Sequence, residues 1–260
     1  MTDNNITPFA PFIDELWIQD WDNIILCDID GTIFRDSFFL YIFNGLVNIT
    51  WRYEYLSIHD EYLKKWKDRE IPYDEYLGNI IPLFIELVRG VKQKDFEEIC
   101  FNAVEEYNNR TYIFTKNYLK NKQKEWYKIF FISGSPFEVV KYFSDKNNFN
   151  WAIGSYYLSE DGKKTGERIP LFSNDAKSSV LKYIRSKYSN VTITWIGDTN
   201  WDYSLITQSD YWMAINPARE LAEKLIHNKD SINSNNISII IERKDVNVLL
   251  DIDTLSKTLL

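Results

Sequence analysis

Short apolar segments alternate with helical segments through the second half of this 260-residue chain, and this alternation restricts its fold more than any other feature. The apolar segments are rich in β-branched and aromatic residues, which favour strands. Strands that alternate with helices are typical of a parallel sheet with helices on both faces. We therefore predict an α/β fold with a Rossmann-like core. The predicted strands are "KIFFIS" (128–133), "VTITWIG" (191–197), "YWMAIN" (211–216) and "ISIII" (237–241).

An earlier strand lies in "NIILCDIDGTIF" (23–34), and its apolar run ends in two aspartates. Asp28 and Asp30 are two positions apart, so their side chains begin on the same face of the strand. Two like charges in one place are costly unless a positive group lies between them. In parallel sheets, ligands bind beyond the carboxyl ends of the strands, where these aspartates fall. The pair therefore marks a candidate site that contains a cation.

A block of helical sequence separates this first strand from the later ones, so we predict a helical cap inserted after it. Pro82 lies within this block and is expected to kink or break its helix. Later in the chain, the Asp161-Gly162 pair is typical of a β-hairpin turn. The predicted organisation is a core domain of residues 22–36 and 111–245, a cap of 37–110, an N-terminal extension of 1–21 and a C-terminal tail of 246–260.

Other strand ends also carry polar candidates. Ser133 and Gly134 follow an apolar strand directly before a helix, which offers a hydroxyl and backbone N–H groups to an anion. Asp198 and Asp202 follow the next apolar strand, and Lys177 lies early in a helix. Carboxylates without a nearby His or Cys favour a hard divalent ion, and Mg²⁺ is the natural choice. A lysine and a metal ion among these carboxylates predict a site that accepts a phosphate.

Four motifs in order, "DIDGT", "ISG", a lone lysine opening a helix and "GDTNWD", resemble the signature motifs of the haloacid dehalogenase-like superfamily. The resemblance covers residues 22 to about 228. Within it, "DGKKTGERIP", "NDAK" and "AINPARELAEKL" resemble the phosphoserine phosphatase-like branch, whose helical cap is inserted between the first and second motifs. This resemblance implies the same fold and a Mg²⁺-dependent phosphoric monoester hydrolase.

The resemblance also implies a role for each motif residue. Asp28 is similar to the nucleophile that forms an aspartyl-phosphate, and Asp30 to the general acid and base. Mg²⁺ would bind the carboxylates of Asp28 and Asp198 and the backbone carbonyl of Asp30. Three residues would bind the phosphoryl group: Ser133, Gly134 and Lys177. Asp202 would be a further metal-shell residue or a partner for Lys177.

Two positions depart from the pattern of this branch. Trp201 stands where the branch usually has an asparagine, directly before the last motif aspartate. Ser37 stands where phosphoserine phosphatases carry a glutamate that reads the substrate. We therefore expect phosphoserine to be a poor substrate, and a less polar or cationic-headed phosphomonoester to suit the aromatic-rich cap better.

The predicted function is the hydrolysis of a small phosphorylated metabolite through an aspartyl-phosphate. A phosphotransferase or phosphomutase with the same site is an alternative. A haloacid dehalogenase would not use Asp30, which argues against that chemistry. A non-catalytic phosphate-binding protein is a further alternative, and Trp201 is the feature that favours it.

Composition excludes other classes of function. The net charge is −8 and the chain has no Lys/Arg run, so we expect no nucleic-acid partner. We also expect no membrane span, since no apolar run is long enough, and no signal peptide, since the start lacks a basic region. The two cysteines are isolated in the sequence, so we expect neither a disulfide framework nor a cysteine metal site. The protein is predicted to be cytoplasmic. His59 and His227 lie in polar helical segments and are expected at the surface. The sequence leaves the oligomeric state open.

Overall fold

The computed structural model describes Ile13 and residues 17–149, 151–171, 174–206, 208–232, 236–244 and 246–258. Most of the predicted N-terminal extension (1–21) lies outside these residues. Among the described helices, none combines the length and the apolar character that crossing a bilayer requires.

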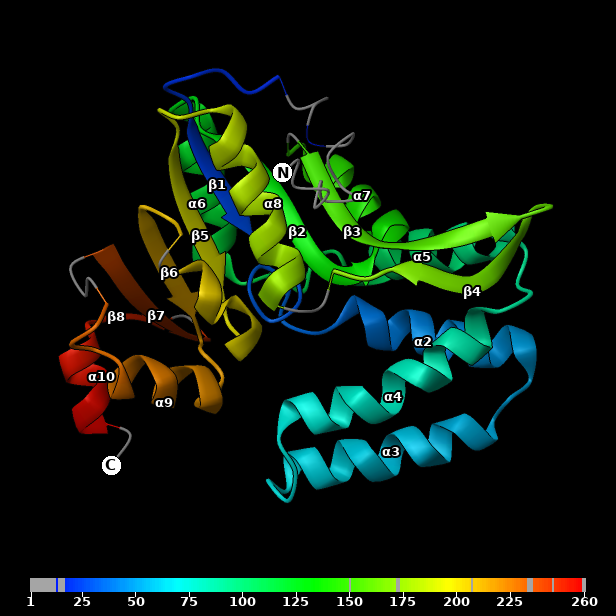
Figure 1. Ribbon diagram of the computed structural model, residues 1–260. Coiled ribbons are helices and arrows are strands. Elements are labelled where there is room, and N and C mark those ends of the chain that lie inside the picture. Colours follow the sequence, from blue (N-terminus) through cyan, green and yellow to red (C-terminus); the bar gives the residue numbers. More distant parts are fainter. Residues whose placement is uncertain are drawn as a thin grey trace, which may run out of the picture.

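An eight-stranded sheet forms the centre of the described chain, in the order β4-β3-β2-β1-β5-β6-β7-β8 (Figure 1). The six strands from β3 to β7 in this order are parallel, and each edge strand is antiparallel to its neighbour. The predicted α/β fold with a largely parallel sheet is confirmed. The strands are β1 (Asn23–Cys27), β2 (Lys128–Pro136), β3 (Trp151–Glu160), β4 (Lys163–Ile169), β5 (Thr192–Gly197), β6 (Tyr211–Ile215), β7 (Ile237–Arg243) and β8 (Val246–Leu250).

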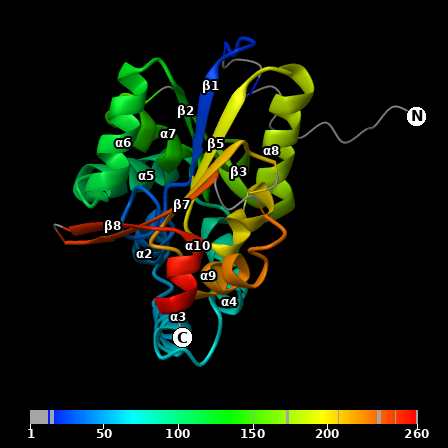
Figure 2. The same cartoon turned by 90° about the vertical axis from the view of Figure 1, so that its left-hand side faces the viewer.

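Side chains of β1 alternate between two buried layers, as a strand covered on both faces requires. Ile25 and Cys27 belong to one apolar cluster, whereas Ile24 and Leu26 belong to the other. Helices α6 (Ile113–Lys124) and α7 (Phe137–Lys146) lie on one side of the sheet, and α8 (Asn174–Lys187) lies on the other (Figure 2). Residues of α9 (Arg219–His227) and α10 (Ile252–Thr258) join the second cluster.

Four further helices come between β1 and α6 in the chain. Figure 1 shows α2 (Phe38–Thr50), α3 (Glu54–Lys67) and α4 (Tyr73–Val88) beyond the carboxyl ends of the central strands. Helix α5 (Gln93–Tyr107) packs against α7 instead. Helix α4 continues through Pro82, so a break at this proline is wrong. Division of the chain into a core and a cap domain stays a prediction.

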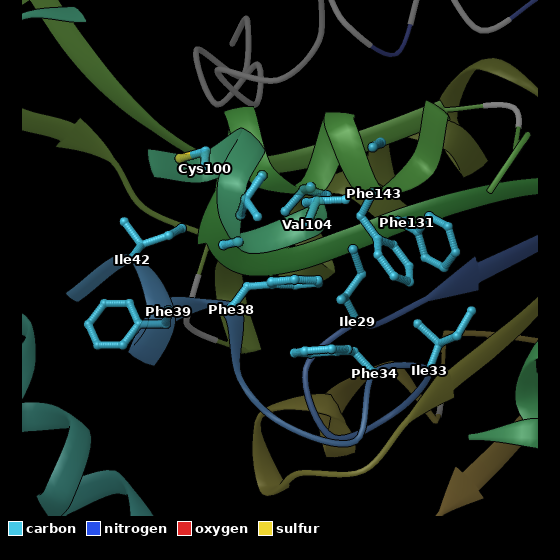
Figure 3. Close-up of a cluster of buried hydrophobic side chains, with 14 of the residues drawn as sticks. Ile29, Ile33, Phe34, Phe38, Phe39, Ile42, Cys100, Val104, Phe131 and Phe143 are labelled. Atoms are coloured by element: carbon cyan, nitrogen blue, oxygen red, sulfur yellow. The ribbon is translucent and has the colours of Figure 1, made fainter. Parts of the chain in front are cut away.

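The start of α2 lies in the apolar cluster that also contains Ile25 and Cys27 of β1 (Figure 3). The Phe38 ring stacks on Phe34 with 3.9 Å between centroids, and it meets Phe143 of α7 edge-on at 5.5 Å. Phe38 is fully buried. Because these rings come from the loop after β1, from α2 and from α7, they position α2 relative to the end of β1.

Two segments differ from the sequence expectation. Strand β8 pairs with β7, and α10 packs in the second apolar cluster, although both lie in the segment 246–260 that was expected to be a tail. His59 is buried rather than at the surface, because its ring packs near Phe43 and its Nε2 lies 3.1 Å from the hydroxyl of Tyr76. His227 is exposed, as expected.

Candidate active site

The register of the three central strands brings their carboxyl ends to one level. Cys27 is paired with Phe131 of β2 and with Ile196 of β5. The residues that follow these partners therefore reach the same edge of the sheet as Asp28. Asp28 is 6% exposed, and its Oδ1 accepts a hydrogen bond of 2.7 Å from the backbone N–H of Ile29.

Lys177 joins two of the predicted carboxylates. Its Nζ lies 2.5 Å from Oδ2 of Asp28 and 2.7 Å from Oδ1 of Asp202. All three side chains are buried, since Lys177 is 1% exposed and Asp202 is fully covered. Lys177 lies in the first turn of α8, so the helix carries the ammonium to the sheet edge, as the sequence predicts.

Asp202 also organises the loop after β5. Its Oδ2 accepts hydrogen bonds from the backbone N–H groups of Asp198 and Thr199, at 3.2 and 3.1 Å. The Thr199 side chain completes a capping box at the start of the 3₁₀ helix η1 (Asn200–Leu205). Both carboxylate oxygens of Asp202 are thus engaged, one by Lys177 and one by the loop. Of the two roles considered for Asp202, the partner of Lys177 matches this geometry.

Asp198 faces the first motif. Its Oδ1 accepts a hydrogen bond of 2.7 Å from the hydroxyl of Thr32. Gly31 lies beside it with φ of +79°, and a Cβ at this position would come 2.1 Å from Asp198 Oδ2. A glycine is therefore required for the close approach of the two motifs. This contact of Thr32 was not predicted from the sequence, although its place in "DIDGT" was a usable signal.

Asp30 is held by groups from two distant segments. Its Oδ1 accepts a hydrogen bond of 2.8 Å from the backbone N–H of Phe38, the first residue of α2. Its Oδ2 accepts a hydrogen bond of 2.5 Å from the Ser135 hydroxyl. The Ser135 contact was also missed, and the signal for it was the second serine of "SGSP".

A cavity of about 60 Å³ connects most of the predicted residues. Ser133 is 1% exposed, and its hydroxyl oxygen accepts a hydrogen bond from the backbone N–H of Ser135 at 3.1 Å. Residues from the loop after β1 and from β2, α2, α4, α8 and η1 meet around this space. The lining includes the predicted residues Asp28, Asp30, Ser133, Gly134 and Lys177 together with Ser37, Phe39, Tyr73, Ser135, Thr199 and Trp201.

Burial changes the protonation of these groups. It raises the pKa of Asp28 to about 7, although Lys177 acts in the opposite direction. It raises the pKa of Asp30 to about 6 against the hydrogen bond from Ser135. Burial, followed by the charges of Asp28 and Asp202, also raises the pKa of Asp198. For Lys177, burial lowers the pKa, but Asp202 and Asp28 outweigh this and hold it above its ordinary value. Without a metal ion, the site therefore holds more buried carboxyl groups than one ammonium can keep ionised.

A group of three carboxylates could hold a metal ion. Oxygen atoms of Asp28, Asp198 and Asp202 lie within 4.8 Å of one another. Oxygen ligands of this kind suit Mg²⁺, and the raised pKa values mark negative charge that a cation would stabilise. The side chain of Asp30 is outside this group, and its two oxygens accept the hydrogen bonds from Phe38 and Ser135.

A larger cleft of about 780 Å³ opens beside the small cavity. The two spaces share six lining residues, which are Asp30, Ser37, Phe39, Tyr73, Leu77 and Thr199. Helices α2, α3 and α4 form one wall of the cleft, and the start of α9 forms part of the other. The lining includes Phe39, Leu40, Trp66, Lys67, Arg69, Glu70, Tyr76, Asp198, Arg219, Glu220 and Glu223.

No family model and no curated protein match this sequence. Solved structures do match. A protein of unknown function from Bordetella pertussis Tohama I has a TM-score of 0.62 and 13% identity, covering 80% of this chain and 96% of that chain. A phosphoserine phosphatase in apo form has a TM-score of 0.55 and 17% identity, with coverage of 86% and 95%. A structure described as a phospho-aspartyl intermediate analogue of phosphoserine phosphatase has a TM-score of 0.52 and 16% identity, with coverage of 82% and 100%.

The two phosphoserine phosphatase structures match this chain over almost their whole length. At these identities, the similarity establishes the fold and leaves the chemistry to the residues of the site. The resemblance predicted from the four motifs is thus confirmed at the level of the fold. The chain has the haloacid dehalogenase-like fold, in the form that the phosphoserine phosphatases have.

Proposed function

We propose that this protein is a Mg²⁺-dependent phosphatase, which hydrolyses a small phosphomonoester through an aspartyl-phosphate on Asp28. The observation that carries the proposal is the single cavity lined by Asp28, Asp30, Ser133 and Lys177. A nucleophile, a proton donor and phosphate-binding groups are thereby available to one phosphoryl group. The fold supports the same chemistry, since one structure of this fold is described as a phospho-aspartyl intermediate analogue of phosphoserine phosphatase.

In the first step, a carboxylate oxygen of Asp28 attacks phosphorus and the bond from phosphorus to the leaving oxygen breaks. Asp30 donates its proton to that oxygen, so the alcohol leaves in neutral form. Its pKa of about 6 suits this task, because a useful fraction is protonated near neutral pH. The hydrogen bonds from Phe38 and Ser135 hold its carboxyl in place during the transfer.

In the second step, the Asp30 carboxylate takes a proton from water, and the water oxygen attacks phosphorus. The bond between phosphorus and Asp28 breaks, which releases inorganic phosphate and restores the nucleophile. Ser133, Gly134 and Lys177 bind the phosphoryl oxygens in both steps. Since Lys177 already lies 2.5 Å from Asp28, its charge is in place for the anion that the nucleophile receives.

The carboxylates of Asp28 and Asp198 and the backbone carbonyl of Asp30 would hold Mg²⁺. When bound, the ion supplies positive charge that lets a phosphate dianion approach the carboxylates. We assign Asp202 to positioning, because its two oxygens hold Lys177 and the loop that carries Asp198. Residues 37–110 would form the cap that covers the phosphate, while residues 22–36 and 111–245 form the core.

We infer that the protein works in the cytoplasm on a phosphorylated metabolite. Cys27 and Cys100 are both free and buried, which fits a reducing compartment. The acidic net charge gives no support to a nucleic-acid partner.

Hydrolysis of p-nitrophenyl phosphate with and without Mg²⁺ tests the proposal. We expect release of p-nitrophenol and inorganic phosphate in equal amounts with Mg²⁺, and background rates in excess EDTA. Phenol release without inorganic phosphate would identify transfer to another acceptor instead of water. The covalent step is tested by acid quenching with ³²P-labelled substrate, followed by mapping of the labelled peptide. Label on a residue other than Asp28 would contradict the mechanism.

A further inference from the structure

Four aromatic side chains form a continuous series of ring contacts from the larger cleft to the small cavity. Trp66 of α3 stacks on Tyr76 of α4 with 5.6 Å between centroids, and it contacts Tyr73 at 5.1 Å. The Tyr73 ring in turn contacts Trp201 of η1 at 6.3 Å. We call Tyr76, Trp66, Tyr73 and Trp201 the aromatic series. It leads from the helical cap to the loop that follows β5, next to the proposed phosphate site.

The position of Tyr73 ties this series to the chemistry. Tyr73 lines both the small cavity and the larger cleft, as does Asp30. A volume of about 60 Å³ accommodates little more than a phosphoryl group, so the alcohol part of a substrate must extend into the larger cleft. It does so through the opening that Asp30 and Tyr73 border together with Ser37, Phe39, Leu77 and Thr199. The space beyond is about 780 Å³, within the usual range for ligand pockets of ~300–1,000 Å³.

The exposure of the rings indicates which faces are open. Tyr76 is 1% exposed and lies behind the others, where its hydroxyl contacts His59. Trp66 and Tyr73 are half-buried and line the cleft. A buried tyrosine backed by a histidine therefore supports two rings that keep part of their surface toward the ligand space. Rigid aromatic surfaces of this kind bind flat rings by offset or edge-on stacking.

The charges in the cleft do not select a charged head group. Arg219 is paired with Glu223 at 2.6 Å. Two further charged residues of the lining also have ion-pair partners, since Arg35 pairs with Glu242 and Asp36 with Arg110. Apart from Asp30 and Asp198 of the proposed phosphate site, the remaining charges are two basic residues, Lys67 and Arg69, and two acids, Glu70 and Glu220. This balance favours neither a cationic nor an anionic substituent, so the aromatic surface is the feature that remains for discrimination.

We propose that the substrate is a phosphomonoester whose alcohol carries a planar ring, which lies against Trp66 and Tyr73. This inference rests on the proposed phosphatase function, because it places the phosphoryl group in the small cavity. The ring then lies in the cleft, and the alcohol chain that joins it to the phosphoryl group passes through the opening bordered by Asp30 and Tyr73. A ringless compound such as phosphoserine leaves most of the cleft unfilled and gains no stacking.

A series of esters built on one ethyl scaffold tests this inference, since the leaving groups are then closely matched. The series is ethyl phosphate, 2-phenylethyl phosphate, 2-cyclohexylethyl phosphate and choline phosphate, with phosphoserine as reference. We expect kcat/KM for 2-phenylethyl phosphate to exceed that for ethyl phosphate at least about tenfold. It should also exceed the value for the cyclohexyl ester, which is apolar and similar in size but not planar.

Variants show whether the preference comes from these rings. Trp66→Leu and Tyr73→Leu should each reduce the ratio of kcat/KM for the phenyl ester to that for ethyl phosphate severalfold. Trp51→Leu is the matched control, because Trp51 is 76% exposed and is not among the residues that line the cleft. Thermal melting of each variant verifies folding before the ratio is measured.

The outcomes separate the two levels of the proposal. Turnover of ethyl phosphate with equal rates for the phenyl and cyclohexyl esters, or with choline phosphate fastest, overturns the ring preference and keeps the phosphatase. An unchanged ratio in both Trp66→Leu and Tyr73→Leu also overturns it. If no ester is hydrolysed, the phosphatase proposal fails. Calorimetric binding of 2-phenylethyl phosphonate and ethyl phosphonate then decides the ring preference, and equal affinity refutes it.

Discussion

The Nζ atom of Lys177 lies 2.5 Å from Oδ2 of Asp28, and the same ammonium lies 2.7 Å from Asp202. One buried cation thus stabilises two buried carboxylates that come from different strand ends. Burial still raises the pKa of Asp28 to about 7, so the single ammonium does not offset the cost of desolvation. The site is therefore suited to receive further positive charge.

Asp28→Asn should reduce phosphatase activity to background while the fold is retained. The amide keeps the shape of the side chain but removes the nucleophilic charge and one metal ligand. Turnover of p-nitrophenyl phosphate, with circular dichroism as a check on folding, measures this. Asp145→Asn is the control, since Asp145 pairs with Lys141 on the exposed side of α7. A folded Asp28→Asn protein that keeps more than a few per cent of the activity would exclude the covalent mechanism.

Asp30→Asn should slow hydrolysis in a way that depends on the leaving group. Loss of general acid catalysis typically costs ~10²–10⁴ in rate. Alkyl phosphates need the proton most, whereas p-nitrophenol leaves readily without it. The ratio of wild-type to variant kcat should therefore be larger for ethyl phosphate than for p-nitrophenyl phosphate. Equal losses for the two esters would contradict the role of Asp30 as the acid.

Lys177→Met should abolish activity and destabilise the fold, because Asp28 and Asp202 lose their cation. Breaking a buried ion pair by removing one partner typically costs ~3–5 kcal/mol. Adding Asp202→Asn should recover part of the stability, but not the activity, since one unpaired charge is then gone. Denaturant unfolding of the two single variants and the double variant measures this coupling, and purely additive effects would argue against it.

A second buried lysine gives a control for this experiment. Lys164 is 3% exposed and lies 2.7 Å from Glu138, away from the candidate site. Lys164→Met should also lower stability, but the folded variant should keep its activity. Loss of activity in both lysine variants at equal fractions folded would mean that the Lys177 effect is structural alone.

Stability of the metal-free protein should fall as pH rises from about 4 to about 7. In the folded state the pKa values are about 7 for Asp28 and about 6 for Asp30, above the ordinary value of 3.8. Over this range the folded protein holds more protons than the unfolded chain, so raising the pH favours unfolding. The stabilisation that these two protonated carboxyl groups give is complete below their ordinary pKa of 3.8 and is lost above about pH 7. A tenfold change in an acid dissociation constant corresponds to ~1.4 kcal/mol of free energy.

Melting temperatures in EDTA, compared between wild type and Asp28→Asn, isolate this effect from other titrating groups. Since the variant lacks the buried charge, its melting temperature relative to wild type should rise between about pH 5 and pH 7.5. Each kcal/mol corresponds to ~2–4 °C in a chain of this size. A difference that stays constant with pH would show that Asp28 does not titrate in this range.

Mg²⁺ should be required for activity and should also stabilise the fold near neutral pH. Binding to the folded state alone raises the melting temperature with metal concentration. Ca²⁺ should inhibit, because it prefers more ligands at longer distances and would place the nucleophile badly. Asp198→Asn should weaken the melting shift that Mg²⁺ produces. Full activity in excess EDTA would refute the metal requirement.

Local sequence predicted the largely parallel sheet and the strand ends at which the candidate residues lie. The apolar run from Ile24 to Cys27 ends where Asp28 begins, and the alternation of strands and helices indicates a parallel sheet. Carboxyl ends of parallel strands share one edge, so the gathering of Asp28, Ser133 and Asp198 followed from local pattern and sheet geometry together. The aspartate pair also predicted excess negative charge at that edge.

Tertiary structure decided how those groups are paired. The bonds from Ser135 and Phe38 to Asp30, and the division of Asp202 between Lys177 and its own loop, join segments far apart in the sequence. Burial of His59 and the contact between Tyr73 and Trp201 likewise depend on how α2, α3 and α4 pack. Periodicity specifies which face of a segment is apolar, whereas the partner that covers this face is selected by the packing of the whole chain.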